Sequence, residues 1–585
     1  MIRKLIQYAA LATVVGLGAC EKNLVTENEV SGDTKKVLGT PNDAEALIST
    51  YYKRWSSGVY GSTTDIEGMA NVMSLMNYSS LANNCQNARW PFGNVSNGNA
   101  PGNVCAGEQY RLYSVLGEVD RVASNLLTAM DATTNPLTLG TSAAATDARN
   151  LRARAFAEFL RGLSLGYIAL MHDSGAVIAP GMDGQDPGKL VGYVQVMDSA
   201  YAAFDRAIVY SNTTPTGTGG FPIPVSWLPS PTVWTPVEFV KLIRTYKARF
   251  RANVARTPAQ RAAADWTKIV ADAQAGITSD HLITTSTTQG PGNSWRGQYL
   301  TFTTWHQMPA FYIGMADVSG SYASWIALPV GQRGAGNTGF FMQTPDLRFP
   351  QGATRAAQIA DLDKVSCQTA STPCKRYWVN RAAGNDDFSG NSWGFSNYDH
   401  IRFYSWTRAG DGTAQNGNTP FFTIAELDML QAEGLYRQGN YAGAAALVNK
   451  TRTAPMGGTP LVAKGGGLPA ITAFDATTVV PGGANCVPQV PGFGTPLGDF
   501  TKVGCGNLWE ALKYEKRIET AYTHYAPWFL DGRGWGELPK DTPLFWAVPY
   551  QDLQSRGRPT SAIYGAGPGT GNAAGSVAGA STYGW

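Results

Sequence analysis

A series of helix-start signals, each followed by apolar residues at helical spacing, constrains the fold more than any other feature of the sequence. Thr235-Pro236-Val237-Glu238 combines a capping threonine, a proline at the first helical position and a glutamate three residues after the cap. Thr257-Pro258 repeats part of this signal, and Thr423 starts another helix. A helix that opens near Asp147 carries one apolar stripe, made of Phe156, Leu160, Leu163, Tyr167 and Leu170. The chain is therefore expected to be all-α.

Long stretches rich in Gly, Asn, Ser and Pro separate these helices. The helical scaffold is expected mainly over residues 41–56, 106–278, 421–455 and 507–523. The loop-rich insertions are residues 57–105, 279–420 and 456–506. The helices pair into hairpins similar to tetratricopeptide units, but the sequence has no regular 34-residue period. We therefore expect one domain over residues 41–585, in which a helical scaffold carries long loops.

The N-terminus is typical of an exported lipoprotein. The basic residues Arg3 and Lys4 precede a mostly apolar stretch, Leu5–Gly18, which is shorter than the roughly 20 residues of a membrane-spanning helix. The stretch ends in Leu17-Gly18-Ala19-Cys20, which resembles a lipobox. Cys20 is thus the predicted lipid anchor, and a diacylated cysteine gives stable membrane attachment. The alternative is a non-lipidated signal with an incidental cysteine. The predicted segments are a signal peptide, residues 1–19, and a polar tether, residues 20–40.

Six further cysteines form three pairs that are local in the sequence, which suits an oxidising compartment. Pairing between nearest neighbours closes the smallest loops. The predicted disulfides are Cys85–Cys105, Cys367–Cys374 and Cys486–Cys505. The alternative is a metal site, which is disfavoured because no CxxC motif and no histidine accompanies these thiols. No metal or cofactor is therefore expected.

The sequence does not indicate nucleic-acid binding or catalysis. Lys and Arg number 46 against 43 Asp and Glu, which leaves no strongly basic field for nucleic acid. Gly390–Gly394 matches GxSxG but lies in an Asn/Ser/Gly-rich loop, whereas a nucleophile elbow needs a strand before it and a helix after it. Glu515 and Glu519 share one face of a predicted helix, with Arg517 offset from them. This pattern favours a structural salt-bridge cluster over a catalytic pair, and no catalytic residue is assigned.

Several segments resemble the SusD/RagB family of outer-membrane lipoproteins, and they occur in the family's order. Arg152–Tyr167 resembles its long central helix, and Phe422–Arg452 resembles its most recognisable hairpin. Glu515–Glu519 is similar to the Glu-x-Arg-x-Glu motif, and Asp531–Gly536 is similar to the segment that follows it. Val548-Pro549 matches an Ile-Pro near the end of family members.

The resemblance implies a fold in which tetratricopeptide-like hairpins pack against a loop-rich, ligand-facing half. It also implies a non-enzymatic lipoprotein on the outer surface of the outer membrane. Such a protein captures glycans, or in some relatives peptides, and delivers them to a TonB-dependent SusC-like transporter. Thr523–Pro527 replaces the family's usual Glu-Gly-x-Arg, which indicates a divergent branch whose ligand the sequence does not identify. The competing hypotheses are a surface glycoside hydrolase with two convergent carboxylates and a ligand-free helical-repeat adaptor with an exposed apolar groove.

Sugar recognition requires aromatic faces against C–H bonds and planar polar groups for hydroxyls. The candidate ligand-binding residues in the loops are Asn84, Arg89, Trp90, Trp295, Trp305 and Trp393. Trp90 is the leading candidate because it lies between Cys85 and Cys105. The competing interpretation of each tryptophan is that it fills the core, and Trp266, on a helical stripe, is assigned to the core.

Overall fold

The protein is mostly helical, and the computed structural model describes most of its predicted scaffold. The described residues are 38–60, 66–79, 99–101, 108–183, 186–217, 219–286, 290–291, 306–328, 340–361, 376–380, 396–402, 417–455, 465–492, 503–523, 525–539 and 542–558. Within these ranges, none of the helices combines the length and apolar character needed to cross a bilayer.

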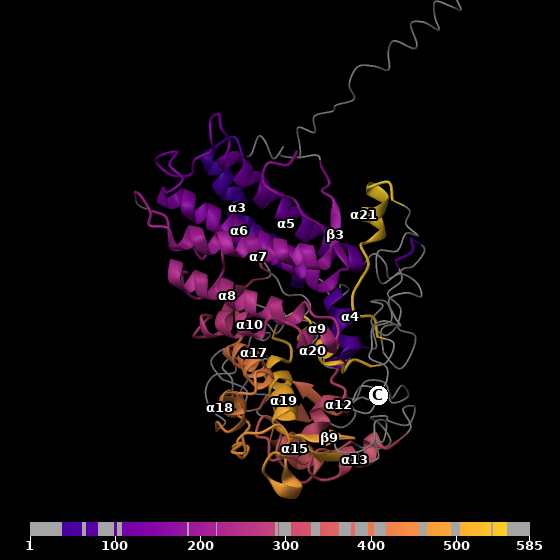
Figure 1. Ribbon diagram of the computed structural model, residues 1–585. Helices are drawn as coiled ribbons and strands as arrows, with labels where there is room; N and C mark the ends of the chain where they lie inside the picture. The colour runs from indigo at the N-terminus through magenta and orange to yellow at the C-terminus, as the bar shows by residue number, and fades with distance from the viewer. Residues whose placement is uncertain are drawn as a thin grey trace, which may run out of the picture.

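Helices from the first half of the chain pack side by side (Figure 1). They are α3 (Pro41–Tyr60), α5 (Glu108–Met130), α6 (Ala148–Met171), α7 (Tyr193–Asn212), α8 (Pro236–Asn253), α9 (Pro258–Ala262) and α10 (Trp266–Gln274). The hairpin of α17 (Ile424–Arg437) and α18 (Tyr441–Arg452) continues this stack, and α19 (Leu508–Thr520) packs against both of its helices. The predicted all-α class is confirmed.

Short helices and strands make up the rest of the described fold, and two of the short helices, α12 and α20, pack against α19. The short helices are α4 (Ile66–Met73), α12 (Ala310–Ile313), η3 (Gly314–Ala316), α13 (Ser321–Ile326), α15 (Arg355–Ala360), η6 (Gly483–Asn485), α20 (Pro527–Trp535) and α21 (Tyr550–Ser555). The strands of the described residues form five antiparallel pairs: β1 (Tyr78–Ser79) with β5 (His306–Gln307), β2 (Ser174–Ala176) with β3 (Leu190–Gly192), β4 (His281–Thr285) with β8 (Gly417–Phe422), β6 (Trp378–Asn380) with β7 (Tyr398–His400), and β9 (Gln489–Pro491) with β10 (Val503–Cys505).

Helix α6 lies at the centre of the helical stack. The Asp147 carboxylate caps it by accepting a hydrogen bond from the Arg149 amide at 3.0 Å, as the sequence predicted. At Gly166 a Cβ would lie 2.0 Å from the Phe250 ring, so the missing side chain lets α8 approach closely. The predicted single apolar stripe was incomplete, because neighbouring helices cover α6 on every side. Even Arg161 is buried there, between Asp120 and Glu158.

The structure differs from the predicted helices in four places. Helix α3 continues to Tyr60, and α4 forms inside the predicted loop 57–105 because its Ile, Met and Val side chains pack into the core. Thr257 does cap a helix, but α9 has only five residues, and Asp265 caps α10 separately. Helices α20 and α21 follow α19, beyond the last predicted scaffold range, 507–523.

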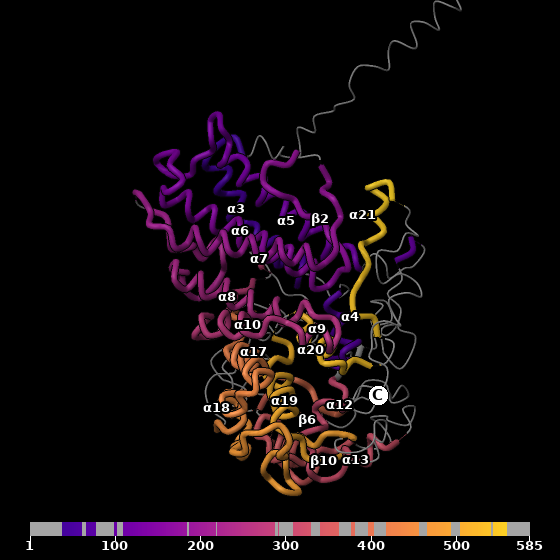
Figure 2. Tube along the Cα trace, in the orientation of Figure 1, coloured from indigo at the N-terminus to yellow at the C-terminus, as the bar shows by residue number. Residues whose placement is uncertain are grey.

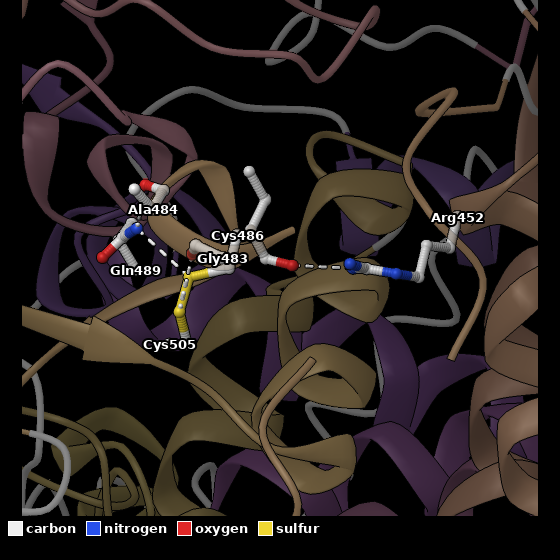
Figure 3. The surroundings of a disulfide bond; sticks show 7 residues. Arg452, Gly483, Ala484, Cys486, Gln489 and Cys505 are labelled. Carbon is white, nitrogen blue, oxygen red and sulfur yellow. Dashed lines mark hydrogen bonds between the residues drawn. A yellow bond between two sulfur atoms is a disulfide. The ribbon is translucent and has the colours of Figure 1, made fainter. Parts of the chain in front are cut away.

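The predicted disulfide Cys486–Cys505 is confirmed. It links the segment before β9 to the end of β10, with the two Cα atoms 5.7 Å apart (Figure 3). On one side Gln489 Nε2 donates to the Cys486 sulfur, and on the other Arg452 donates to the Val487 carbonyl at 2.8 Å. The bridge therefore holds the β9–β10 pair beside α18.

Removing this bridge should destabilise the protein measurably. The cysteines are 19 residues apart, and closing a loop of that length restricts the unfolded chain by about 3 kcal/mol. The double variant Cys486→Ala/Cys505→Ala should lose about that much unfolding free energy in urea titrations followed by circular dichroism. An unchanged midpoint would contradict a stabilising role for the bridge.

Candidate functional site

The predicted ligand-binding residues and most predicted cysteines fall outside the described residues. These are Asn84, Arg89, Trp90, Trp295, Trp305 and Trp393, together with Cys20, Cys85, Cys105, Cys367 and Cys374. The GxSxG string at Gly390–Gly394 also falls outside them. Their assignments stay predictions. The described residues nevertheless show where the segments that carry these side chains join the fold.

Two of these segments join the fold at one strand pair. Strand β1 comes directly before the segment that contains Trp90, and β5 comes directly after Trp305. The two strands pair antiparallel, with Ser79 opposite His306. Residues more than 200 positions apart in the chain therefore become neighbours at this point.

The segment that contains Trp393 joins the fold beside them. Ser396 follows it and uses both its amide and its hydroxyl to donate to the Met308 carbonyl, at 3.2 and 2.5 Å. Met308 in turn follows β5, and its sulfur accepts a hydrogen bond from the Trp378 indole at 2.9 Å. Trp378 opens β6, which precedes the same segment. Three predicted ligand-binding segments thus start or end within one small region, which we call the loop base: Ser79, His306, Met308 and Ser396.

The far end of the Trp90 segment is also fixed. The Asn99 side chain donates to the Val548 carbonyl at 2.7 Å and accepts from the Tyr550 amide at 2.9 Å. On the near side, the Tyr522 hydroxyl donates to the Met76 carbonyl at 3.2 Å. Residues from the C-terminal part of the chain therefore hold both ends of this segment.

A buried charge cluster ties α19 to the start of β6, where the Tyr377 amide donates to the Arg348 carbonyl at 2.8 Å and the Tyr377 hydroxyl donates to Glu519 at 2.9 Å. The Arg348 guanidinium, fully buried, bonds Asp346 at 2.7 Å, Glu515 at 2.7 Å and Glu519 at 3.0 Å. Arg402 pairs with the same Glu519 at 3.3 Å. Burial raises the pKa of the Glu519 carboxyl, although both arginines oppose this shift. The predicted salt-bridge cluster of Glu515 and Glu519 is confirmed, but its central cation is Arg348.

Other buried carboxylates are paired in the same way. Glu433 binds Arg261 at 2.6 Å, with both side chains fully buried, and Glu426 binds Arg249 at 2.6 Å. Burial alone would raise the pKa of Glu433, but Arg261 and neighbouring cations lower it to about 2. These pairs fix α8 and α9 to α17, and their carboxylates are held as structural anions. In the described ranges, no three His, Cys, Asp or Glu side chains are arranged to bind a metal ion.

The residues that hold the ends of these segments were not predicted from the sequence. Asn99 and Arg348 lie in stretches without periodicity, and the partners Val548 of Asn99 and Glu515 of Arg348 are more than 150 residues away. Asp346 and Arg348 are only two residues apart, which is a weak local signal for an ion pair. Trp266 was assigned correctly to the core, where it is 5% exposed.

No protein-family model and no curated protein matches the sequence. Solved structures resemble the fold. A SusD superfamily protein from Parabacteroides distasonis is 10% identical, with 88% of this chain and 97% of that chain covered and a TM-score of 0.50. A Bacteroides vulgatus protein named as a proposed sugar-binding protein is 10% identical over 91% and 99%, with a TM-score of 0.48. A SusD/RagB family protein from Bacteroides thetaiotaomicron is 12% identical over 92% and 97%, with a TM-score of 0.44. This chain therefore has a SusD-like fold, as its sequence motifs predicted.

Proposed function

We propose that the protein is a non-catalytic lipoprotein of the outer-membrane surface that captures glycans for a TonB-dependent, SusC-like transporter. The SusD-like fold is the single observation that carries this proposal. A fold alone does not assign a function, and the lipobox-like Leu17–Cys20 adds independent support for a surface anchor.

The loop base supports a ligand site formed by Asn84, Arg89, Trp90, Trp295, Trp305 and Trp393. Three segments that carry these residues join the fold at Ser79, His306 and Ser396, so their side chains can meet over a common support. Loops that are held by a rigid scaffold lose less conformational freedom when they bind a ligand. A rigid support therefore favours binding.

The charge pairs favour binding over hydrolysis. A glycosidase needs two carboxyl groups that face a cleft and are free to exchange protons. The buried carboxylates of Glu426, Glu433, Glu515 and Glu519 are instead bonded to arginines inside the core. Their positions leave them no contact with a ligand.

The transporter partnership is tested by a pull-down from detergent-solubilised outer membranes with the intact lipoprotein. We expect a large TonB-dependent β-barrel to co-purify. The matched control is Cys20→Ser, which should lose membrane attachment. Isolation of the wild-type protein alone would contradict the partnership and favour a free-standing surface binder or an adaptor.

The ligand site is tested by a glycan-binding screen with Trp90→Ala. If Trp90 stacks on a sugar ring, its removal should weaken binding about tenfold or more, since aromatic contacts dominate such sites. The control is Phe474→Ala, which removes a 54% exposed aromatic side chain from another surface. Equal affinities for both variants and the wild type would remove Trp90 from the site.

A further inference from the structure

An open groove with a volume of about 350 Å³ lies where the start of α7 meets the end of α8 and the turn between α9 and α10. Figure 2 shows α7 and α8 side by side in the helical stack. We call this space the α7 groove. The loop-base residues are not among those that line it. Its volume is at the low end of the range for small-molecule sites, so it suits a small molecule better than a folded partner.

Most of the wall of the α7 groove is apolar. The residues that form it are small or branched aliphatic side chains from three elements: Val194 on α7, Val254 and Ala255 at the end of α8, and Ala263 and Ala264 between α9 and α10. Val194 is 54% exposed, which leaves a branched apolar side chain in water at the edge of the groove. A ligand that covers Val194 therefore gains the free energy of removing apolar surface from water.

One carboxylate at the α7 groove has no partner. Asp198 lies one turn along α7 from Val194, is exposed and lines the groove, and in the described part of the chain it forms no hydrogen bond or ion pair. The other lining carboxylate, Asp265, instead caps α10 and pairs with Lys268 at 2.9 Å. Asp198 is therefore the charged acceptor that a ligand in the groove can use.

Two arginines beside the groove are already bonded within the protein. Arg251 lines the groove and pairs with Asp272 at 3.0 Å. Arg256 lies over the ring of Tyr193, 3.6 Å from its centroid, and donates to two carbonyls at the C-terminal end of α6, at 3.2 and 2.6 Å. Neither guanidinium group balances the charge of Asp198 by direct contact.

These features select among ligand classes. An anion would be repelled by Asp198 and would compete with protein groups for both arginines. A purely apolar ligand would remove water from Asp198 without giving it a partner, which is unfavourable. A neutral alcohol could donate a hydrogen bond to Asp198 but would leave its charge uncompensated. An ammonium group on an apolar chain provides both the opposite charge and the apolar surface.

We propose that the α7 groove binds a small organic cation, an ammonium group carried on a short apolar chain. The ammonium group pairs with Asp198, and the chain lies along Val194 and Met197, which also lines the groove. The site is separate from the loop base and does not depend on the function proposed above.

Titration of the full mature chain with hexylammonium, hexanol, hexanoate and methylammonium tests this proposal. The readout is the methyl NMR signal of Met197 in protein labelled at its methionine methyl groups, assigned by the loss of that signal in Met197→Leu. Hexylammonium should shift this signal saturably at millimolar concentrations and should bind more tightly than hexanol, with hexanoate the weakest. Methylammonium carries the charge without the chain, so it should bind about tenfold more weakly than hexylammonium or less.

Two variants with exposed sites of substitution locate the cation. Asp198→Asn should weaken hexylammonium binding about fivefold, the effect of losing an exposed ion pair, and should remove the preference over hexanol. Val194→Lys places an ammonium group one turn from Asp198, where it should fill the site itself and prevent hexylammonium binding. The matched control is Asp205→Asn, which removes a 59% exposed carboxylate two turns further along α7, outside the groove, and should leave the affinity unchanged.

Three outcomes would each overturn the proposal. They are no saturable shift of the Met197 signal by hexylammonium, binding of hexanol or hexanoate as tight as that of hexylammonium, and wild-type affinity in Asp198→Asn. Circular dichroism of each variant shows whether it is folded, so a loss of binding in a folded variant is due to the groove.

Discussion

Replacing Arg348 by methionine should lower the free energy of unfolding by about 3–5 kcal/mol, the effect of breaking a buried charge pair from one side. Arg348 is fully buried and is the shared partner of Asp346, Glu515 and Glu519. Methionine fills much of the same volume but leaves these carboxylates facing one another without their main cation. Urea unfolding followed by tryptophan fluorescence measures the loss.

The matched control is Lys450→Met, which breaks an ion pair whose lysine side chain is 55% exposed. Exposed pairs contribute about 1 kcal/mol or less because water screens them. If both variants lost the same amount of unfolding free energy, the Arg348 cluster would contribute no more to stability than an exposed ion pair does.

Acid should destabilise the protein through two buried histidines, His281 and His172. Burial is the main cause in both, and it lowers the pKa to about 3 for His281 and to about 4 for His172. The unfolded chain binds these protons near pH 6.5, whereas the folded protein excludes them until much lower pH. The stabilisation is therefore complete above pH 6.5 and is lost as the pH falls toward those values.

The variant His281→Phe isolates one of these effects. In the described part of the chain, neither ring nitrogen of His281 has a hydrogen-bond partner, so phenylalanine keeps the packing against Trp234 and loses no bond. Between pH 7 and pH 4 the variant should lose about 3 kcal/mol less unfolding free energy than the wild type. Asp120 and Asp173, whose pKa values burial raises to about 6, act with the opposite sign. They are present in both proteins and cancel in the comparison. If the unfolding free energies of the variant and the wild type fell in parallel with pH, His281 would not be a source of the acid sensitivity.

The parts of the fold that were predicted correctly depend on local signals. Thr235 and Thr423 each accept a hydrogen bond from an amide three residues later, as their sequence contexts predicted. Cys486 and Cys505 are also close in sequence. A cap or a short loop is encoded within a few residues, so one sequence suffices to recognise it.

The parts that were missed depend on distant residues. Helix α20 contains two glycines within nine residues, a composition that predicts a turn, yet Phe529 and Leu530 fix it in the core. Arg348 could not be matched to Glu515 because 167 residues separate them. The same limit applies to the loop base, whose residues come from two separate insertions, 57–105 and 279–420. Tertiary packing determines the structure at α20, Arg348 and the loop base, and these long-range contacts cannot be inferred from a single sequence.

The bonds of Asn99 have a consequence for the order in which the protein matures. Asn99 is held by Val548 and Tyr550, about 450 residues further along the chain. An emerging polypeptide can form α5, α6 and their neighbours from contacts that are close in sequence, but it cannot fix the Trp90 segment until its last residues arrive. Contacts of such long range form late and slowly. The predicted ligand-binding surface can therefore be completed only after the whole chain has been synthesised, and a chain truncated before residue 548 would lack the partners that hold Asn99.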